Sequence, residues 1–334
     1  MGPVYHERRT RRIALLAAAA LHVLSAGTVA AFDLQGHRGA RGLAPENSLP
    51  GFAKALASGV TTLELDLGVT ADDRLVAIHD SRLDPAITRG GDGRWLDEPT
   101  PVVRSLTLEQ IRAHGIGRID PASRYARRFP EQRPHDGARI PTLDEVVALT
   151  EAAGASAVGF NIETKLDPRR PELTPSPEHF ARLVVDEIHR LGIGSRTTVQ
   201  SFDWRTLRAV QALAPEIATA CLTVQQSWLD NLERGRPGPS PWTAGFDLEA
   251  AGGSVPDLVR AAGCRIWSPA YEDLHLLSLT EARAMKLPVI VWTVNDPTTM
   301  EALIDGGVDG IITDYPDRLR RLLQRKGLPV PPGG

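Results

Sequence analysis

The sequence predicts an α/β protein, a (β/α)8 barrel of the TIM type with an inserted subdomain after the third strand. Apolar runs rich in β-branched residues alternate along the chain with segments of helical periodicity, which is typical of a parallel sheet covered by helices. The chain has 334 residues, and one such barrel commonly uses about 250 residues and tolerates insertions. We therefore expect one barrel over residues 32–322, with its insertion at 81–140.

Nine segments are expected as strands, and six as helices. The strands are 32–37, 60–70, 75–80, 157–165, 197–202, 217–223, 264–269, 288–294 and 310–314. The helices are 49–58, 142–153, 178–191, 204–213, 277–286 and 297–305.

Nine strands are one too many for the barrel, and the spacing of the second and third explains the surplus. Parallel neighbours need a crossover of a dozen or more residues, but only four separate Thr70 from Leu75. These two segments should therefore form a hairpin. A turn centred on Asp72 and Asp73 would place Asp66 opposite His79, and Glu64 opposite Ser81.

Two stretches break the alternation of strands and helices. Residues 81–140 are rich in Arg, Asp, Gly and Pro, and a connection of this length is usually functional, so we interpret it as an inserted subdomain or lid over the site. Residues 323–334 end in "GLPVPPGG", which has no apolar periodicity and should be disordered.

The N-terminal residues 1–31 have the pattern of a secretory signal peptide. Four arginines precede the apolar run "IALLAAAALHVL", and the small-residue stretch "SAGTVAA" follows it. The run is shorter than the roughly 20 residues of a membrane span. We expect an exported protein, periplasmic or secreted, without stable membrane insertion after cleavage. An uncleaved anchor is the alternative, and the general and twin-arginine export routes both stay open.

The net charge indicates which class of partner to expect, and the positions of the two cysteines indicate whether they form a disulfide. The chain carries 38 basic and 41 acidic residues, a net charge of -3, which does not favour nucleic acid or an anionic membrane, so a small-molecule partner is expected. Cys221 lies near the end of its expected strand and Cys264 at the start of the next. Because parallel strands keep like ends together, the two should lie beyond the roughly 7 Å limit for a disulfide and stay unpaired.

Charged side chains occur at the carboxyl ends of two expected strands, where a parallel barrel holds its active site. Glu64 and Asp66 are two apart in "LELDL", and Glu163 and Lys165 are two apart in "NIETK", so each pair shares one strand face. Three converging carboxylates repel one another unless a hard cation neutralises them, and oxygen ligands suit Mg²⁺ or Ca²⁺. We expect one such divalent cation.

His37 and His79 also follow strand ends, each beside a charged residue. Imidazole titrates near neutral pH, so two histidines can serve as base and acid on opposite sides of a reaction. Arg38 and Lys165 add the fixed positive charge that a phosphate needs. The glycines around His37 let the backbone turn sharply and approach a ligand.

Six motifs from His37 to about Leu319 give the chain a family resemblance. They are "HRGARGLAPENSLPGF", "LELDLGVTADDRLVAIHD", "NIETK", "VQSFDWRTL", "VWTVNDP" and "GVDGIITDYPDRL". Together they resemble the glycerophosphodiester phosphodiesterase family. The resemblance implies a barrel enzyme that uses a divalent metal to cleave glycerophosphodiesters to sn-glycerol 3-phosphate and an alcohol. It also implies residue roles: His37 and His79 as the acid-base pair, Glu64, Asp66 and Glu163 as metal ligands, Arg38 and Lys165 as phosphate contacts.

Five other residues receive less specific expectations. Gln200 and Trp292 are interpreted as pocket walls that contact substrate, with Trp292 packing either on the glycerol carbons or in the core. The role of Glu46 stays open. Asn47 or Ser48 is expected to cap the following helix.

Two alternative functions remain. One is a phospholipase D-like enzyme of the same barrel group that acts on lipid head groups and would need an exposed apolar rim. The other is a non-catalytic glycerophosphodiester-binding protein. The preferred head-group alcohol and the oligomeric state are not indicated by the sequence.

Overall fold

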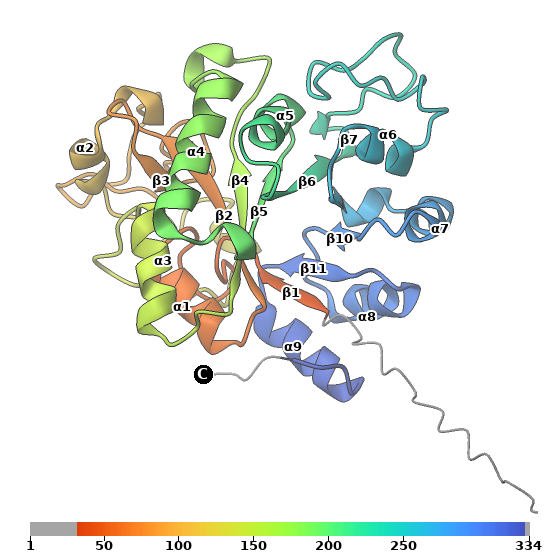
Figure 1. Ribbon diagram of the computed structural model, residues 1–334. Coiled ribbons are helices and arrows are strands. Elements are labelled where there is room, and N and C mark those ends of the chain that lie inside the picture. The colour runs from red at the N-terminus through yellow and green to blue at the C-terminus, as the bar shows by residue number, and fades with distance from the viewer. Residues whose placement is uncertain (1–31, 331–334) are drawn as a thin grey trace, which may run out of the picture. The chain divides into compact units, whose positions relative to one another are not determined.

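The computed structural model describes residues 32–330, and all nine expected strands form there (Figure 1). Eight are parallel neighbours in the order β10, β11, β1, β2, β4, β5, β6, β9. Parallel bridges from Trp267 to Val289 and from Ala270 to Trp292 join the two ends of this row, so the predicted barrel is confirmed in a nearly closed form. The strands are β1 Asp33–Gly36, β2 Thr62–Val69, β3 Leu75–Ala77, β4 Gly159–Thr164, β5 Thr197–Ser201, β6 Ala218–Thr223, β9 Ile266–Pro269, β10 Ile290–Val291 and β11 Gly310–Thr313.

An outer layer of helices follows the strands. Two of them, α6 and α9, were not expected, and α9 continues past residue 323, so the expected disordered tail begins too early. Leu328 and Val330, beyond α9, pack against the core. The outer helices are α1 Leu49–Ala57, α3 Leu143–Ala152, α4 Pro177–Leu191, α5 Trp204–Leu213, α6 Val255–Ala261, α7 Leu276–Ala284, α8 Pro297–Gly306 and α9 Pro316–Arg325.

Within residues 32–330, no helix combines the length and apolar character needed to cross a bilayer. The expected signal peptide, residues 1–31, lies outside the described residues.

The β2–β3 hairpin forms as expected, but the expected register is wrong by one residue. Leu67 pairs with Ala77, and the Ile78 N–H donates to the Asp66 carbonyl (3.0 Å), so Asp66 is opposite Ile78 and not His79. The cause is the turn: Thr70 and Arg74 close a three-residue loop with a 3.0 Å backbone hydrogen bond. Asp73 takes φ +56° there, as three-residue hairpin loops require.

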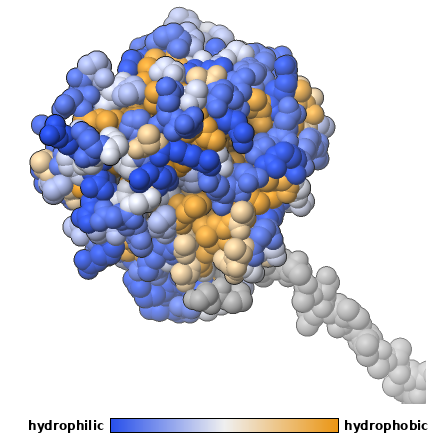
Figure 2. All heavy atoms as spheres, turned by 90° about the vertical axis from the view of Figure 1, so that its left-hand side faces the viewer, coloured by the Kyte–Doolittle hydropathy of each residue, from blue (hydrophilic) through white to orange (hydrophobic). Residues whose placement is uncertain are grey.

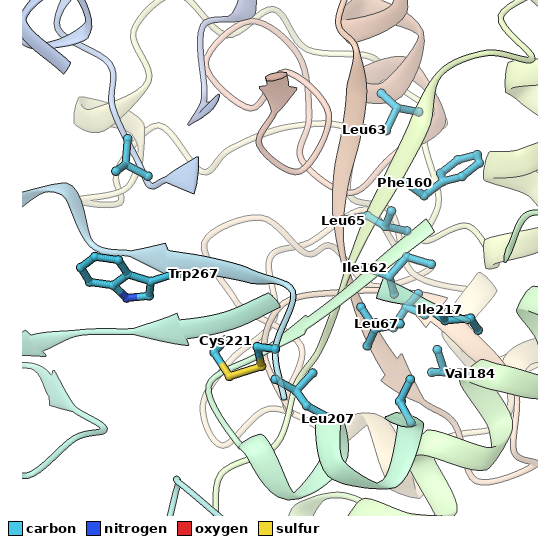
Figure 3. Close-up of a cluster of buried hydrophobic side chains, with 14 of the residues drawn as sticks. Leu63, Leu65, Leu67, Phe160, Ile162, Val184, Leu207, Ile217, Cys221 and Trp267 are labelled. Atoms are coloured by element: carbon cyan, nitrogen blue, oxygen red, sulfur yellow. A yellow bond between two sulfur atoms is a disulfide. The ribbon is translucent and has the colours of Figure 1, made fainter. Parts of the chain in front are cut away.

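Alternation along β2 separates the core from the site. Leu63, Leu65 and Leu67 are fully buried in the main hydrophobic cluster and pack towards the helices (Figure 3). Since successive side chains of a strand point to opposite faces, Glu64 and Asp66 face the barrel interior. The core on one side of the strand therefore fixes the carboxylates on the other.

Residues 81–140 follow β3 and form a segment with short helical pieces, among them α2 Leu108–Arg112. The segment packs on Val76 of β3 in a small separate hydrophobic cluster, whose other buried members are Leu83, Val103, Ile111, Ile116 and Ile140. The face of the molecule on this side is largely hydrophilic, with smaller apolar areas (Figure 2).

Cys221 and Cys264 form a disulfide with Cα atoms 5.8 Å apart, so the prediction of two free thiols is wrong (Figure 3). The prediction placed Cys264 in line with its strand, but β9 begins only at Ile266. Cys264 lies in the turn after α6, where Gly263 has φ +76° and the Cys264 N–H donates to the Val259 carbonyl. The chain therefore approaches from the helix layer, over the outer face of β6.

We expect loss of this disulfide to lower the free energy of unfolding by roughly 2–4 kcal/mol, because it closes a long loop in the unfolded chain; its cysteines are 43 residues apart. Denaturant unfolding of the wild type with and without reductant measures the effect. The Cys221→Ala/Cys264→Ala double variant is the control, and reductant should not change its stability. Alkylation of two thiols in the denatured, non-reduced protein would contradict the pairing.

Candidate active site

The loop after β1 is held close to the start of α1. His37 follows the strand directly, and Arg38 and Gly39 take φ +49° and +87°. A Cβ on Gly39 would lie 2.6 Å from the carbonyl carbon of Gly51, so only glycine fits there. This turn brings the Arg38 backbone N–H to 2.7 Å from Glu64 Oε2.

The three predicted carboxylates converge inside the barrel. Asp66 on β2 is the register partner of Glu163 on β4, and Glu64 lies two residues before Asp66 on the same face. Glu64, Asp66 and Glu163 are all buried, and each offers an oxygen within 4.8 Å of the others. The buried Asp66 Oδ1 has no hydrogen-bond partner. An all-carboxylate set with a free buried oxygen fits a hard divalent cation.

Two cations border this carboxylate triad. Arg38 Nη1 bonds Glu46 Oε1 (2.6 Å), while Arg38 Nε lies 3.2 Å from Asp66 Oδ2 but makes no hydrogen bond. Lys165 Nζ bonds Glu163 Oε1 (2.6 Å) and lies 3.7 Å from Asp66 Oδ1. Both predicted phosphate contacts therefore lie beside the place where an anion would meet the triad.

The pKa values of the three carboxyl groups shift in different directions. Burial, followed by repulsion from Asp66 and Glu163, raises the pKa of Glu64 well above its usual range. Burial also raises the pKa of Glu163 to about 7, although Lys165 opposes this. Burial acts in the same sense on Asp66, but Arg38 and other nearby cationic groups outweigh it and lower its pKa. Asp66 is thus ionised at neutral pH, whereas burial and repulsion favour the protonated form of Glu64.

The two histidines are each oriented by an aspartate. His37 Nδ1 lies 2.7 Å from Asp314 Oδ1, and burial and then Arg41 lower the pKa of His37 to about 4. His79 Nδ1 lies 2.8 Å from Asp80 Oδ1, and burial, Arg38 and Lys165 lower its pKa as well. Both rings are therefore neutral near pH 7.

Gln200 and Glu46 orient charged groups of the site. Gln200 is 2% exposed; its Nε2 donates to Glu64 (3.0 Å) and its Oε1 accepts from Asn161 (2.9 Å). Glu46 binds Arg38 and accepts a hydrogen bond from the Tyr125 hydroxyl. Gln200 thus holds Glu64 in place, and Glu46 does the same for Arg38.

Ser48 caps a helix, whereas its neighbour Asn47 binds a carboxylate of the site. Ser48 caps α1 by accepting from the Gly51 N–H. Asn47 instead donates from Nδ2 to Asp66 Oδ2 (2.8 Å).

A cavity of about 510 Å³ opens onto these groups. Asp66 lies behind its wall, fully buried, and Lys165 borders an adjoining cavity of about 240 Å³ that shares His79 and Glu163 with the first. The predicted residues that line the larger cavity are His37, Arg38, Glu64, His79, Glu163, Gln200 and Trp292.

Several residues of the site were not predicted. Asp314 follows β11 at its carboxyl end, and that position in "GIITD" was the available signal. Arg41, which bonds Asp314 through Nε (2.8 Å), lies in the glycine-rich motif. Tyr125 and Arg128 come from the insertion, and no sequence pattern indicates that they approach the site.

Comparison with known proteins agrees with this geometry. The family model described as the glycerophosphoryl diester phosphodiesterase family matches residues 37–318. A glycerophosphodiester phosphodiesterase of Caldanaerobacter subterraneus subsp. tengcongensis is 30% identical over 297 residues, 87% of this chain and 97% of that protein. One from Bacillus subtilis is 28% identical over 291 residues, covering 86% of this chain and 84% of that protein.

Solved structures share the fold. A protein of Silicibacter pomeroyi DSS-3, named for the same activity, has a TM-score of 0.79 and 34% identity, covering 90% of this chain and 96% of its own. An Oleispira antarctica phosphodiesterase, solved with the product sn-glycerol-3-phosphate, has a TM-score of 0.63 and 20% identity over 88% of this chain and 97% of its own. The chain thus belongs to the glycerophosphoryl diester phosphodiesterase family and is an enzyme that hydrolyses glycerophosphodiesters.

Proposed function

We propose that the enzyme releases sn-glycerol 3-phosphate and an alcohol, with one divalent cation and with His37 and His79 as its acid-base pair. The observation that carries the proposal is that both histidines and two of the three carboxylates line one cavity, with Asp66 directly behind. The sn-glycerol-3-phosphate found in the Oleispira antarctica phosphodiesterase supports the assignment of the product.

Glu64, Asp66 and Glu163 would hold the cation. A bound Mg²⁺ or Ca²⁺ would supply positive charge to polarise the phosphoryl oxygens. Arg38 and Lys165 contribute fixed charge beside the same place, where they orient the phosphodiester and stabilise its developing negative charge. Glu46 keeps the Arg38 guanidinium in position through their 2.6 Å bond.

The histidines transfer protons on either side of the phosphorus. In each ring Nδ1 donates to its aspartate, which leaves Nε2 without a proton and able to accept one. One neutral histidine takes the proton of the attacking oxygen as the new P–O bond forms. The other takes a proton from solvent water beforehand and gives it to the alcohol oxygen as the old P–O bond breaks. Asp314 and Asp80 stabilise the imidazolium form of the ring beside them, which the first step creates on one histidine and the second step consumes on the other.

We also propose that the enzyme acts outside the cytoplasm, in the periplasm or as a secreted protein. The signal-like pattern of residues 1–31 supports this location. The Cys221–Cys264 pair adds support, because structural disulfides persist mainly in oxidising compartments.

Activity should depend on a divalent cation, because the triad otherwise places uncompensated negative charge beside an anionic substrate. The measurement is a coupled assay for sn-glycerol 3-phosphate release from sn-glycero-3-phosphocholine after chelation and metal-free dialysis. Activity should be lost and should return with Mg²⁺ or Ca²⁺. Full turnover of the metal-free protein is the contrary result.

Cation binding should also release protons, since Glu64 and Glu163 have raised pKa values without the ion and must ionise to bind it. Affinity measured by calorimetry should therefore fall as pH drops below about 7, the pKa of Glu163. A pH-independent affinity between pH 6 and 8 would argue against this triad as the ligand set.

His37→Ala and His79→Ala should each reduce kcat by about 10² to 10⁴, the contribution of a general acid or base. His189→Ala is a matched control, because His189 is an exposed histidine on α4 that pairs with Glu216. Circular dichroism should show an unchanged fold in all three variants. If either site variant keeps its wild-type kcat, that histidine is not part of the mechanism.

A further inference from the structure

Three aromatic side chains form a corner on one wall of the main cavity. Trp292 contacts Phe202 with ring centroids 5.3 Å apart and an interplanar angle of 83°. Trp228 lies 6.3 Å from Trp292 at 76°. The two indole planes are therefore nearly perpendicular, in an edge-to-face arrangement. All three residues line the cavity that holds the histidines.

Trp228 is held at the cavity although it is 64% exposed. It lies in the turn of a small hairpin formed by β7 Gln225–Gln226 and β8 Leu229–Asp230, which the sequence did not predict. The hairpin is anchored to Asp273, which accepts hydrogen bonds from the Gln225 N–H (2.7 Å) and from Gln226 Nε2 (2.5 Å). A large indole held by hydrogen-bonded backbone in water at a cavity mouth is well placed to meet a ligand.

A carboxylate lies beside the aromatic corner. Glu272, which precedes the anchor Asp273, lines the same cavity and is exposed. Within residues 32–330, no Lys, Arg or His forms an ion pair with it. Trp292 is fixed on the same side, since its carbonyl accepts from the Tyr271 N–H (2.9 Å) and its Nε1 donates to the Ser268 carbonyl (2.9 Å). The wall thus combines two indole faces with an uncompensated negative charge.

Lys165 approaches the aromatic corner, with its Nζ 5.7 Å from the centroid of the Phe202 ring, but it is bonded to Glu163 of the triad at 2.6 Å. The other cations lie at different parts of the cavity wall. Arg38 lies at the triad, paired with Glu46. Arg128 comes from the insertion, and its guanidinium stacks 5.7 Å from the Phe129 ring and 5.9 Å from the Tyr125 ring. The phosphate of the substrate would therefore lie beside the triad. One of the two groups esterified to that phosphate would then contact the aromatic corner.

We propose that Trp228, Trp292 and Glu272 bind the leaving alcohol of the substrate and select one that carries a methylated ammonium cation. This inference rests on the proposed function and specifies its substrate class. Indole faces attract cations through the ring quadrupole, and a methylated ammonium needs few hydrogen-bond acceptors. The Glu272 carboxylate supplies the negative charge that attracts this cation. Trp292 accordingly contacts the alcohol and not the glycerol carbons.

The test compares two diesters that differ in one charge. They are sn-glycero-3-phosphocholine and its uncharged isostere, in which 3,3-dimethylbutanol replaces choline. In the wild type kcat/KM should favour the choline ester by roughly 5- to 30-fold, the range that a cation-π site with a nearby carboxylate supports, mainly through KM. Glu272→Gln and Trp228→Leu should each bring this ratio towards one, since Leu keeps apolar area but has no π face.

Leu277→Ala is the matched control, because Leu277 is 78% exposed on α7 and is not among the residues that line the cavity. It should leave the ratio unchanged. A wild-type ratio near one overturns the proposal, and so does an unchanged ratio in both site variants. An equal loss on both diesters would mean that the corner packs on the glycerol, which also overturns it.

The same substrates separate this inference from the proposed function. If the wild type hydrolyses neither diester, the proposed function fails. The dissociation constants of the two diesters, measured by calorimetry, then test the corner independently: a preference for the choline ester that Glu272→Gln removes supports it, and equal affinities overturn it.

Discussion

The site is built around the repulsion among three buried carboxylates. Glu64, Asp66 and Glu163 place their oxygens within 4.8 Å of one another, at a depth where water screens little of the interaction. Two protein cations offset part of this charge, and raised pKa values on Glu64 and Glu163 offset more. A divalent cation would remove the remaining repulsion and allow the protons to leave.

The surrounding scaffold holds these charges where they would otherwise separate. Asp66 and Glu163 are register partners on adjacent strands, so they cannot move apart without breaking the sheet. Amide side chains fix the oxygens: Asn47 binds Asp66, and Gln200 binds Glu64. Such a hydrogen-bonded shell is the means by which a rigid barrel keeps ligands ready for an ion.

The sequence was most informative where strand periodicity decides the geometry. The two-residue spacing in "LELDL" and "NIETK" sufficed to predict that the carboxylates share one strand face, because alternate side chains share a face. The hairpin register failed because a three-residue turn cannot be distinguished from a two-residue one when Asp72 and Asp73 suit both. The disulfide was missed because its geometry depends on the path of the chain after α6, which periodicity does not encode.

Other features of the site depend on long-range contacts. Asp314 reaches His37 across 277 positions of sequence, through the pairing of β1 with β11. Trp228 lies in a loop whose short strands, β7 and β8, are too brief to show alternation. Contacts of this kind form only once the barrel has closed, so they cannot be predicted from a local sequence pattern.

Thermal unfolding with and without Mg²⁺ or Ca²⁺ tests the carboxylate triad most directly, with the wild type compared to Glu64→Gln. Both oxygens of Glu64 accept from N–H donors, one from the Arg38 backbone and one from Gln200, and glutamine replaces one of them with an NH2 group. The melting temperature of each protein in chelator therefore serves as its own baseline. A cation at about 100 times its Kd should stabilise the wild type by about 2.7 kcal/mol and raise its Tm, while Glu64→Gln should respond far less. Equal shifts in the two proteins, or no shift in the wild type, would contradict a cation site at the triad.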